Sequence, residues 1–200
     1  MLNQKIRGAW DSAMRPVGRS LAAAGVGPNA ITVAGVAVQV AAAGAIIAGR
    51  LVLAGLLAVV AAVADAIDGA VAKARCNTGK LGALFDSTAD RLSDALFFVP
   101  VAWLYGVAPD PSREGQTWVA ALALTALVAS FLVSYVKARA EGLGFECNVG
   151  IAERAERLIL MILGLLLNLI PVVLAVLAAL AGITVVQRFL HVRAQTRSAA

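Results

Sequence analysis

Six apolar segments, each about as long as a membrane-spanning helix, constrain this chain more than any other feature of its sequence. They lie at about 30–49, 51–75, 82–107, 118–135, 155–170 and 171–188. A helix needs about 20 predominantly apolar residues to cross the hydrocarbon core of a bilayer. Hydrophobic residues make up 60% of the 200 residues, whereas a soluble domain has roughly 45–50%. The sequence therefore predicts an all-α integral membrane protein with six transmembrane helices.

The segment before the first span, residues 1–24, has a different pattern. Its apolar residues recur every three or four positions opposite charged ones, which predicts an amphipathic helix. Such a helix lies in the membrane interface, with its basic side chains toward anionic lipid. A helix packed on a neighbouring protein surface would show the same pattern. The apolar positions are Leu2, Ile6, Trp10, Met14, Val17 and Leu21, and the charged ones are Lys5, Arg7, Asp11, Arg15 and Arg19. A break follows at 25–29, where we expect Asn29 to cap the first span.

The distribution of positive charge predicts the orientation of the chain. Of 17 lysines and arginines, only Arg50 and Arg113 fall on the face that we assign to the outside, so the positive-inside rule places both termini in the cytoplasm. The formal net charge is +5, but its basic residues form no stripe interleaved with aromatics, so we expect no nucleic-acid partner. We expect a multi-pass protein of the cell inner membrane, with a juxtamembrane helix (1–24), a six-helix membrane domain (25–193) and a cytoplasmic tail (194–200).

Four aspartates lie in sequence that is apolar enough to enter a bilayer. Asp65 and Asp68 are three residues apart and Asp86 and Asp90 four apart, so each pair projects from one face of its helix. A short polar loop joins the two helices, which brings the pairs to the same membrane face. Four carboxylates there would repel one another unless a cation lay between them. Oxygen ligands without nearby His or Cys favour Mg²⁺, Mn²⁺ or Ca²⁺.

Two other interpretations of the aspartates remain open. They would be buried hydrogen-bonding groups in a purely structural role, or the carboxylates of an ion or proton transporter. Transporters commonly interrupt their helices at the middle of the membrane. These aspartates instead cluster at one membrane face, which favours a surface-facing metal site.

The central stretch has the pattern D-x2-D-G-x2-A-K-x8-G-x3-D-x3-D. Its residues are Asp65, Asp68, Gly69, Ala72, Lys73, Gly82, Asp86 and Asp90. This pattern resembles the signature of the CDP-alcohol phosphotransferases, integral membrane enzymes that make phospholipid head groups. The family pattern has Arg where this chain has Lys73, which keeps the charge and loses bidentate geometry. The segments 134–141, 150–157 and 185–188 are similar to those of the phosphatidylinositol phosphate synthases of actinobacteria within this family, and 28–32 resembles the family's N-terminal segment.

The resemblance implies displacement of CMP from CDP-diacylglycerol by an alcohol. Two divalent ions, Mg²⁺ with Mn²⁺ as an alternative, would clamp the diphosphate. Their expected ligands are Asp65, Asp68, Asp86 and Asp90. The resemblance supports a second role for Asp90 as the general base that accepts the hydroxyl proton. Small residues would let the nucleotide approach the helix backbone, and the residues expected to contact CDP-diacylglycerol are Asn29, Thr32, Gly69, Ala72, Lys73 and Gly82.

A second anionic substrate needs cations of its own. Lys137, Arg154 and Arg188 lie at the predicted cytoplasmic ends of the last three spans, where they would form a basic pocket for a phosphomonoester. Ordinary positive-inside charge would also account for each of them. The resemblance implies that the pocket holds inositol phosphate. The alternative acceptor is glycerol 3-phosphate, as in a phosphatidylglycerophosphate synthase, and the resemblance also implies a homodimer.

Overall fold

The computed structural model describes residues 14–75, 79–108, 111–151 and 153–198, and this part of the chain is helical with short connections. Its complete helices are α2 (Pro28–Ile47), α3 (Leu51–Ala74), α4 (Lys80–Gly106), the short 3-10 helix η1 (Pro111–Arg113), α5 (Thr117–Gly142), α6 (Arg154–Leu166) and α7 (Ile170–Ser198). Residues 14–23 are helical as well. Residues 1–13 lie outside the described part, so the amphipathic helix over 1–24 stays a prediction.

Four of these helices, α2, α3, α5 and α7, are long and apolar enough to cross a membrane. The other two depart from our expectation for different reasons. α4 has 27 residues, but the part from Lys80 to Asp94 carries five charged residues: Lys80, Asp86, Asp90, Arg91 and Asp94. α6 has only 13 residues, fewer than the roughly 20 that a perpendicular span needs. The all-α membrane architecture is confirmed, and the count of six spans stays a prediction.

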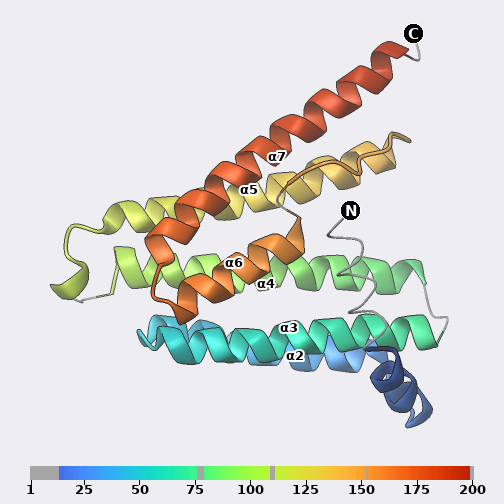
Figure 1. Cartoon of the computed structure of the whole chain (residues 1–200), viewed down its shortest axis with the longest axis horizontal. Helices are drawn as coiled ribbons and strands as arrows, with labels where there is room; N and C mark the ends of the chain where they lie inside the picture. The colour runs from blue at the N-terminus through green and yellow to red at the C-terminus, as the bar shows by residue number, and fades with distance from the viewer. Residues whose placement is uncertain (1–13, 76–78, 109–110, 152, 199–200) are drawn as a thin grey trace.

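The helices form a bundle built on an antiparallel hairpin of α2 and α3 (Figure 1). α4 packs against α2 and against α5, while α6 packs against α3 and α7. α5 and α7 also pack together, and α7 diverges from the rest of the bundle toward its C-terminus (Figure 1). The start of α6 therefore lies between the hairpin and the α5–α7 pair.

The apolar core gathers at one end of the bundle, which we call the turn end because it holds the turn between α2 and α3. Its large members include Ile46, Phe98 and Leu165. Close approach of helices there depends on small residues, as is typical in membranes. A Cβ added to Gly55 would lie 2.7 Å from a methyl group of Leu166. The opposite end, where α3 ends and α4 begins, holds the signature aspartates, and we call it the aspartate end.

Two helix ends differ from the sequence-based expectation. The N-cap of α2 is Gly27, with proline in the first turn, so Asn29 lies inside the helix and our expectation that it caps the helix was wrong. Proline's fixed φ and missing N–H suit the first helical position. At the other end of the chain, α7 continues past Arg188, where we expected the last helix to end, to Ser198. Residues 194–198 of the expected tail are therefore helical.

Candidate active site

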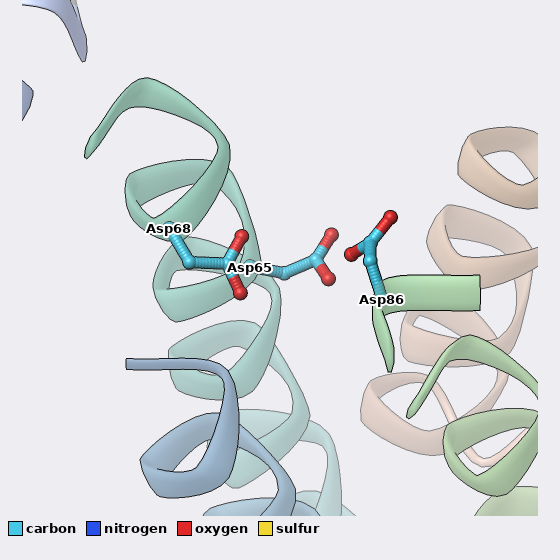
Figure 2. Close-up of side chains that lie close together, drawn as sticks. All are labelled: Asp65, Asp68 and Asp86. Atoms are coloured by element: carbon cyan, nitrogen blue, oxygen red, sulfur yellow. The ribbon is translucent and has the colours of Figure 1, made fainter. Parts of the chain in front are cut away.

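Three of the four signature aspartates converge at the aspartate end. Asp65 and Asp68 project from α3 toward Asp86 at the start of α4 (Figure 2). One carboxylate oxygen from each lies within 4.8 Å of the others. Asp68 is buried, Asp65 half-buried and Asp86 exposed. Three carboxylate oxygens at this separation form a donor set that suits a hard divalent cation.

Thr32 of α2 fixes the orientation of the buried member of this cluster. Its hydroxyl donates a hydrogen bond of 2.6 Å to Oδ2 of Asp68. Thr32 is 9% exposed and Asp68 5%, so water has little access to the pair. A hydrogen bond from outside the coordination sphere commonly orients a metal ligand in this way. We had expected Thr32 to contact the donor substrate, and the hydrogen bond gives it a further role.

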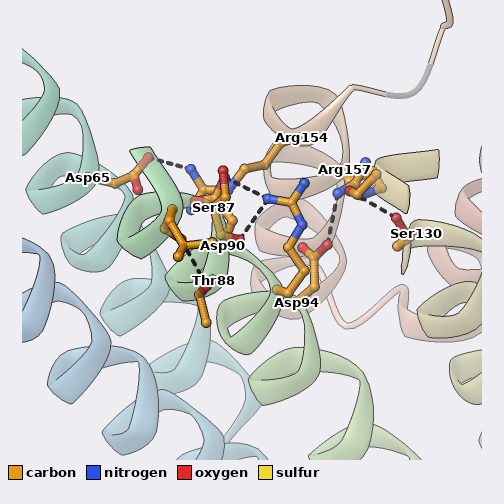
Figure 3. A network of polar contacts seen from close by, with 11 residues as sticks. Asp65, Ser87, Thr88, Asp90, Asp94, Ser130, Arg154 and Arg157 are labelled. Carbon is orange, nitrogen blue, oxygen red and sulfur yellow. Dashed lines mark hydrogen bonds and ion pairs between the residues drawn. The ribbon is translucent and has the colours of Figure 1, made fainter. Parts of the chain in front are cut away.

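Asp90, the fourth signature aspartate and the fourth expected metal ligand, lies one turn beyond Asp86 and is not part of the cluster of three. The guanidinium of Arg154, at the start of α6, contacts Oδ2 of Asp65 at 2.7 Å and Oδ1 of Asp90 at 2.9 Å (Figure 3). We had expected this arginine to bind the phosphate of an acceptor. In the structure it bridges a residue of the acidic cluster and Asp90, and its expected contact with the acceptor phosphate stays a prediction.

A second ion pair lies further along the same helix faces. Arg157 of α6 contacts Oδ2 of Asp94 at 2.8 Å (Figure 3). Arg157 is 4% exposed. We did not single out Asp94 from the sequence, although it follows Asp90 by four residues and so shares its helix face. The pair ties α4 to α6 directly beside the bridge made by Arg154.

A cavity of about 240 Å³ opens beside the acidic cluster, between α2, α3 and α4. We call it the glycine cavity, and it is lined by residues that include Asn29, Thr32, Asp68, Gly69, Ala72, Gly79, Gly82 and Asp86. A Cβ added to Gly69 or Gly82 would meet no described protein atom within 4 Å, so packing does not require these glycines. Five of the six residues expected to contact the donor line this cavity.

Lys73, the sixth of those residues, lines a different cavity. This cavity, which we call the Lys73 cavity, has a volume of about 190 Å³ and is also lined by Arg15 and Arg19. Ala70 and Ala74 complete its described lining. The structure therefore places Lys73 toward the helical segment 14–23 rather than beside the other residues expected to contact the donor.

A larger cavity of about 640 Å³ opens between α4, α5, α6 and α7. We call it the basic cavity because its five cationic lining residues outnumber its four acidic ones. The cations are Arg91, Lys137, Arg154, Arg157 and Arg188, and the acids are Asp90, Asp94, Glu141 and Glu153. All three residues expected to bind the acceptor phosphate therefore share one cavity. Arg188 is 4% exposed, and its guanidinium donates hydrogen bonds to the carbonyl oxygens of Val149 and Val133. These contacts hold the loop before α6 against α5 and α7.

The fold and the site together define a class of protein: a helical membrane protein with a carboxylate cation site between a glycine-lined cavity and a basic one. Comparison with known families narrows this class. The family model described as CDP-alcohol phosphatidyltransferase matches residues 26–187. The chain belongs to this family, as its signature had indicated.

Individual relatives agree with that assignment. The chain is 40% identical over 130 residues to the archaetidylinositol phosphate synthase of Methanothermobacter thermautotrophicus, a match that covers 65% of this chain and 61% of the relative. It is 38% identical over 148 residues to the phosphatidylinositol phosphate synthase of Corynebacterium glutamicum, covering 74% and 66%. This chain thus spans about two thirds of the length of these curated relatives or slightly less.

A solved structure shares most of this architecture. The crystal structure of Mycobacterium tuberculosis phosphatidylinositol phosphate synthase with CDP-DAG bound matches at a TM-score of 0.79 and 31% identity, covering 90% of this chain and 92% of that one. The same enzyme in complex with manganese and citrate also matches at 0.79, with 30% identity and coverage of 90% and 88%. The resemblance to actinobacterial enzymes of this kind is confirmed.

Proposed function

We propose that this chain is a phosphatidyltransferase that moves the phosphatidyl group of CDP-diacylglycerol to inositol phosphate and releases CMP. The observation that carries the proposal is the position of the carboxylates between two cavities. Asp68 and Asp86 line the glycine cavity, and Asp90 and Arg154 line the basic cavity. A donor in the first cavity and an acceptor in the second would meet at these side chains. The names of the relatives support the same two substrates.

The acidic cluster would hold the divalent cations of such a reaction. Asp65, Asp68 and Asp86 offer carboxylate oxygens at suitable mutual distances, and a manganese complex of a related enzyme supports a metal of this kind. When bound, Mg²⁺ or Mn²⁺ would neutralise the diphosphate and stabilise the departing CMP as a Lewis acid. The short hydrogen bond from Thr32 keeps Asp68 turned toward the cluster.

The position of Asp90 supports a role as the general base. It lies one turn from Asp86 and lines the basic cavity, within reach of an acceptor bound there. Its carboxylate would take the proton of the acceptor hydroxyl while that oxygen attacks the phosphorus joined to diacylglycerol. The bond from this phosphorus to CMP then breaks. Arg154 lies 2.9 Å from Asp90 and would hold its carboxylate in a fixed orientation.

Lys137, Arg154 and Arg188 would bind the phosphate of the acceptor. Arg188 uses part of its guanidinium to hold backbone carbonyls, and an arginine has five N–H donors in all. Lys137 is less committed, since its contact with Glu141 spans 3.8 Å and its side chain is 37% exposed. Lys137 is therefore the best residue on which to test acceptor binding without disturbing the fold.

The reaction itself is tested with detergent-solubilised protein and labelled CDP-diacylglycerol. We expect CMP release that depends on Mg²⁺ or Mn²⁺ and on inositol phosphate. Glycerol 3-phosphate, the alternative acceptor, is compared at equal concentration, and a higher kcat/KM with it would assign the chain to phosphatidylglycerophosphate synthesis. Metal-independent turnover, or none with any alcohol acceptor, would reject the proposal.

A pair of variants on one helix tests the acceptor site. Lys137→Gln removes a charge that lines the basic cavity, whereas Arg139→Gln removes an exposed charge two residues away that does not line it. Loss of one hydrogen bond to a charged group costs about 1.5–3 kcal/mol, and the lower end of this range corresponds to about a tenfold rise in KM. We expect this rise for inositol phosphate in Lys137→Gln only, with KM for CDP-diacylglycerol unchanged. Equal effects of the two variants would contradict the assignment.

We also infer that the site faces the cytoplasm from the inner membrane. The two basic residues assigned to the outside, Arg50 and Arg113, lie at the turn end, before α3 and in η1. The excess of positive charge lies toward the aspartate end, which supports a cytoplasmic position for the cavities. Family membership gives no support to the ion-transporter alternative. The homodimer stays a prediction.

A further inference from the structure

The Lys73 cavity is separate from both cavities used in the proposed reaction. Gly69 and Ala72 of α3 line the glycine cavity, whereas Ala70, Lys73 and Ala74 line the Lys73 cavity. The C-terminal part of α3 therefore presents one set of residues to the donor side and another to the helical segment 14–23. The second set carries the cation of the family signature.

The segment 14–23 is held tightly against α3. Gly18 is buried, and a Cβ added to it would lie 2.7 Å from the carbonyl carbon of Ala70. Only a residue without a side chain permits this backbone contact. Arg75 also donates a hydrogen bond of 3.3 Å to the carbonyl oxygen of Ala22. The two helical segments therefore meet at a defined distance, and the cavity between them is part of the packed structure.

Every charged residue in the described lining of this cavity is a cation. Arg15 and Arg19 are one helical turn apart, so they project on one side of their helix, and Lys73 faces them from α3. Arginine binds phosphate oxygens through a planar fork and lysine as a point charge. The remaining described lining residues, Ala70 and Ala74, are small, and the three cationic side chains line one cavity.

The position of the cavity suggests the source of the anion. It lies where the apolar span α3 gives way to Lys73 and Arg75, close to the level at which a membrane presents lipid phosphates. Val17, on the exposed side of the segment 14–23, is 39% exposed and apolar. An interfacial helix that carries basic side chains beside an exposed apolar side chain can bind a lipid through both its anionic head group and its acyl chain.

We propose that the Lys73 cavity binds the phosphate of an anionic phospholipid, at a site distinct from the donor and acceptor sites. Two ligands could supply the phosphate oxyanion that this cavity would bind: a lipid head group and free phosphate. Under this proposal Lys73 retains a lipid beside the enzyme and fixes the segment 14–23 to α3. It does not contact the substrate diphosphate.

Binding to the full-length, detergent-solubilised protein tests the proposal without any need for turnover. The probes are dihexanoyl phosphatidylglycerol, dihexanoyl phosphatidylcholine and inorganic phosphate, each titrated by isothermal calorimetry. The triple variant Arg15→Gln/Arg19→Gln/Lys73→Gln removes the charges of the cavity. The matched control, Arg139→Gln/Arg193→Gln/Arg197→Gln, removes three exposed charges that do not line it.

We expect phosphatidylglycerol to bind the wild type and the control more tightly than phosphatidylcholine does. We expect phosphatidylglycerol to bind the triple variant at least about tenfold more weakly than it binds the wild type. Lys73→Arg, which keeps the charge, should retain binding. A Tm of the triple variant equal to that of the wild type shows that weaker binding is not caused by misfolding. If inorganic phosphate shows the same loss and phosphatidylglycerol binds no better than phosphate, the anion site is supported and free phosphate is its ligand.

Two results would overturn the proposal. One is equal affinity of the triple variant and the wild type for both phosphatidylglycerol and phosphate. The other is a tenfold rise in KM for CDP-diacylglycerol in Lys73→Gln, which would indicate that Lys73 contacts the donor substrate, as the sequence analysis had predicted. The binding measurements are made without acceptor and need no turnover. Their outcome therefore tests the lipid site separately from the proposed transferase activity.

Discussion

The hydrogen bond between Thr32 and Asp68 allows a quantitative test of the acidic cluster. Thr32→Val removes the hydroxyl and keeps the shape of the side chain, so Asp68 loses its 2.6 Å donor in a place where water has little access. A hydrogen bond to a charged group contributes about 1.5–3 kcal/mol. At about 1.4 kcal/mol per factor of ten, the dissociation constant for a divalent cation should rise by about 10- to 150-fold.

The assay is a Mn²⁺ titration of the detergent-solubilised protein, in which electron paramagnetic resonance measures the free ion. Substrates are left out, because Thr32 also lines the glycine cavity and a bound donor would mix two effects. Thr32→Ser retains a hydroxyl at the same position and should bind Mn²⁺ much as the wild type does. An unchanged dissociation constant in Thr32→Val, with the same stoichiometry, would refute the view that this hydrogen bond orients a metal ligand.

Three further predictions concern the base, the metal and the loop before α6. Asp90→Asn should abolish CMP release while Mn²⁺ still binds, because Asp90 lies outside the cluster of three; wild-type turnover would remove it from the mechanism. EDTA should abolish activity and added Mn²⁺ should restore it, as measured by CMP release before and after dialysis. Gly150→Ala should lower the free energy of unfolding by about 1–3 kcal/mol, seen as a lower Tm, because Gly150 has a φ of 137° and an added Cβ would clash with Thr184.

The sequence predicted the helices best where apolar runs were long and bounded by turn residues. The hairpin of α2 and α3 begins and ends within about two residues of expectation. The expected span at 155–170 was less accurate, because α6 ends at Leu166 and Asn168 adopts a left-handed conformation with a φ of 55°. Asparagine tolerates this conformation and commonly ends helices with it, a signal that the surrounding leucines conceal.

At the site, helical periodicity was sufficient for contacts within a helix and insufficient for contacts between distant helices. The spacing of Asp65 and Asp68 predicted a shared face, and the structure brings Asp86 to it. The bridge from Arg154 to Asp65 joins residues that are 89 positions apart, which no local pattern encodes. The position of Lys73 likewise depends on how the segment 14–23 packs on α3.

The concentration of apolar packing at the turn end has a mechanical consequence. Regions with few buried apolar contacts open at lower free energy than densely packed ones, so the aspartate end should be the compliant half of the bundle. The helices would then separate at the aspartate end to admit a bulky lipid nucleotide, while their packing at the turn end stays unchanged. Amide hydrogen exchange should accordingly be slower near Phe98 and Leu165 than along the C-terminal halves of α5 and α7.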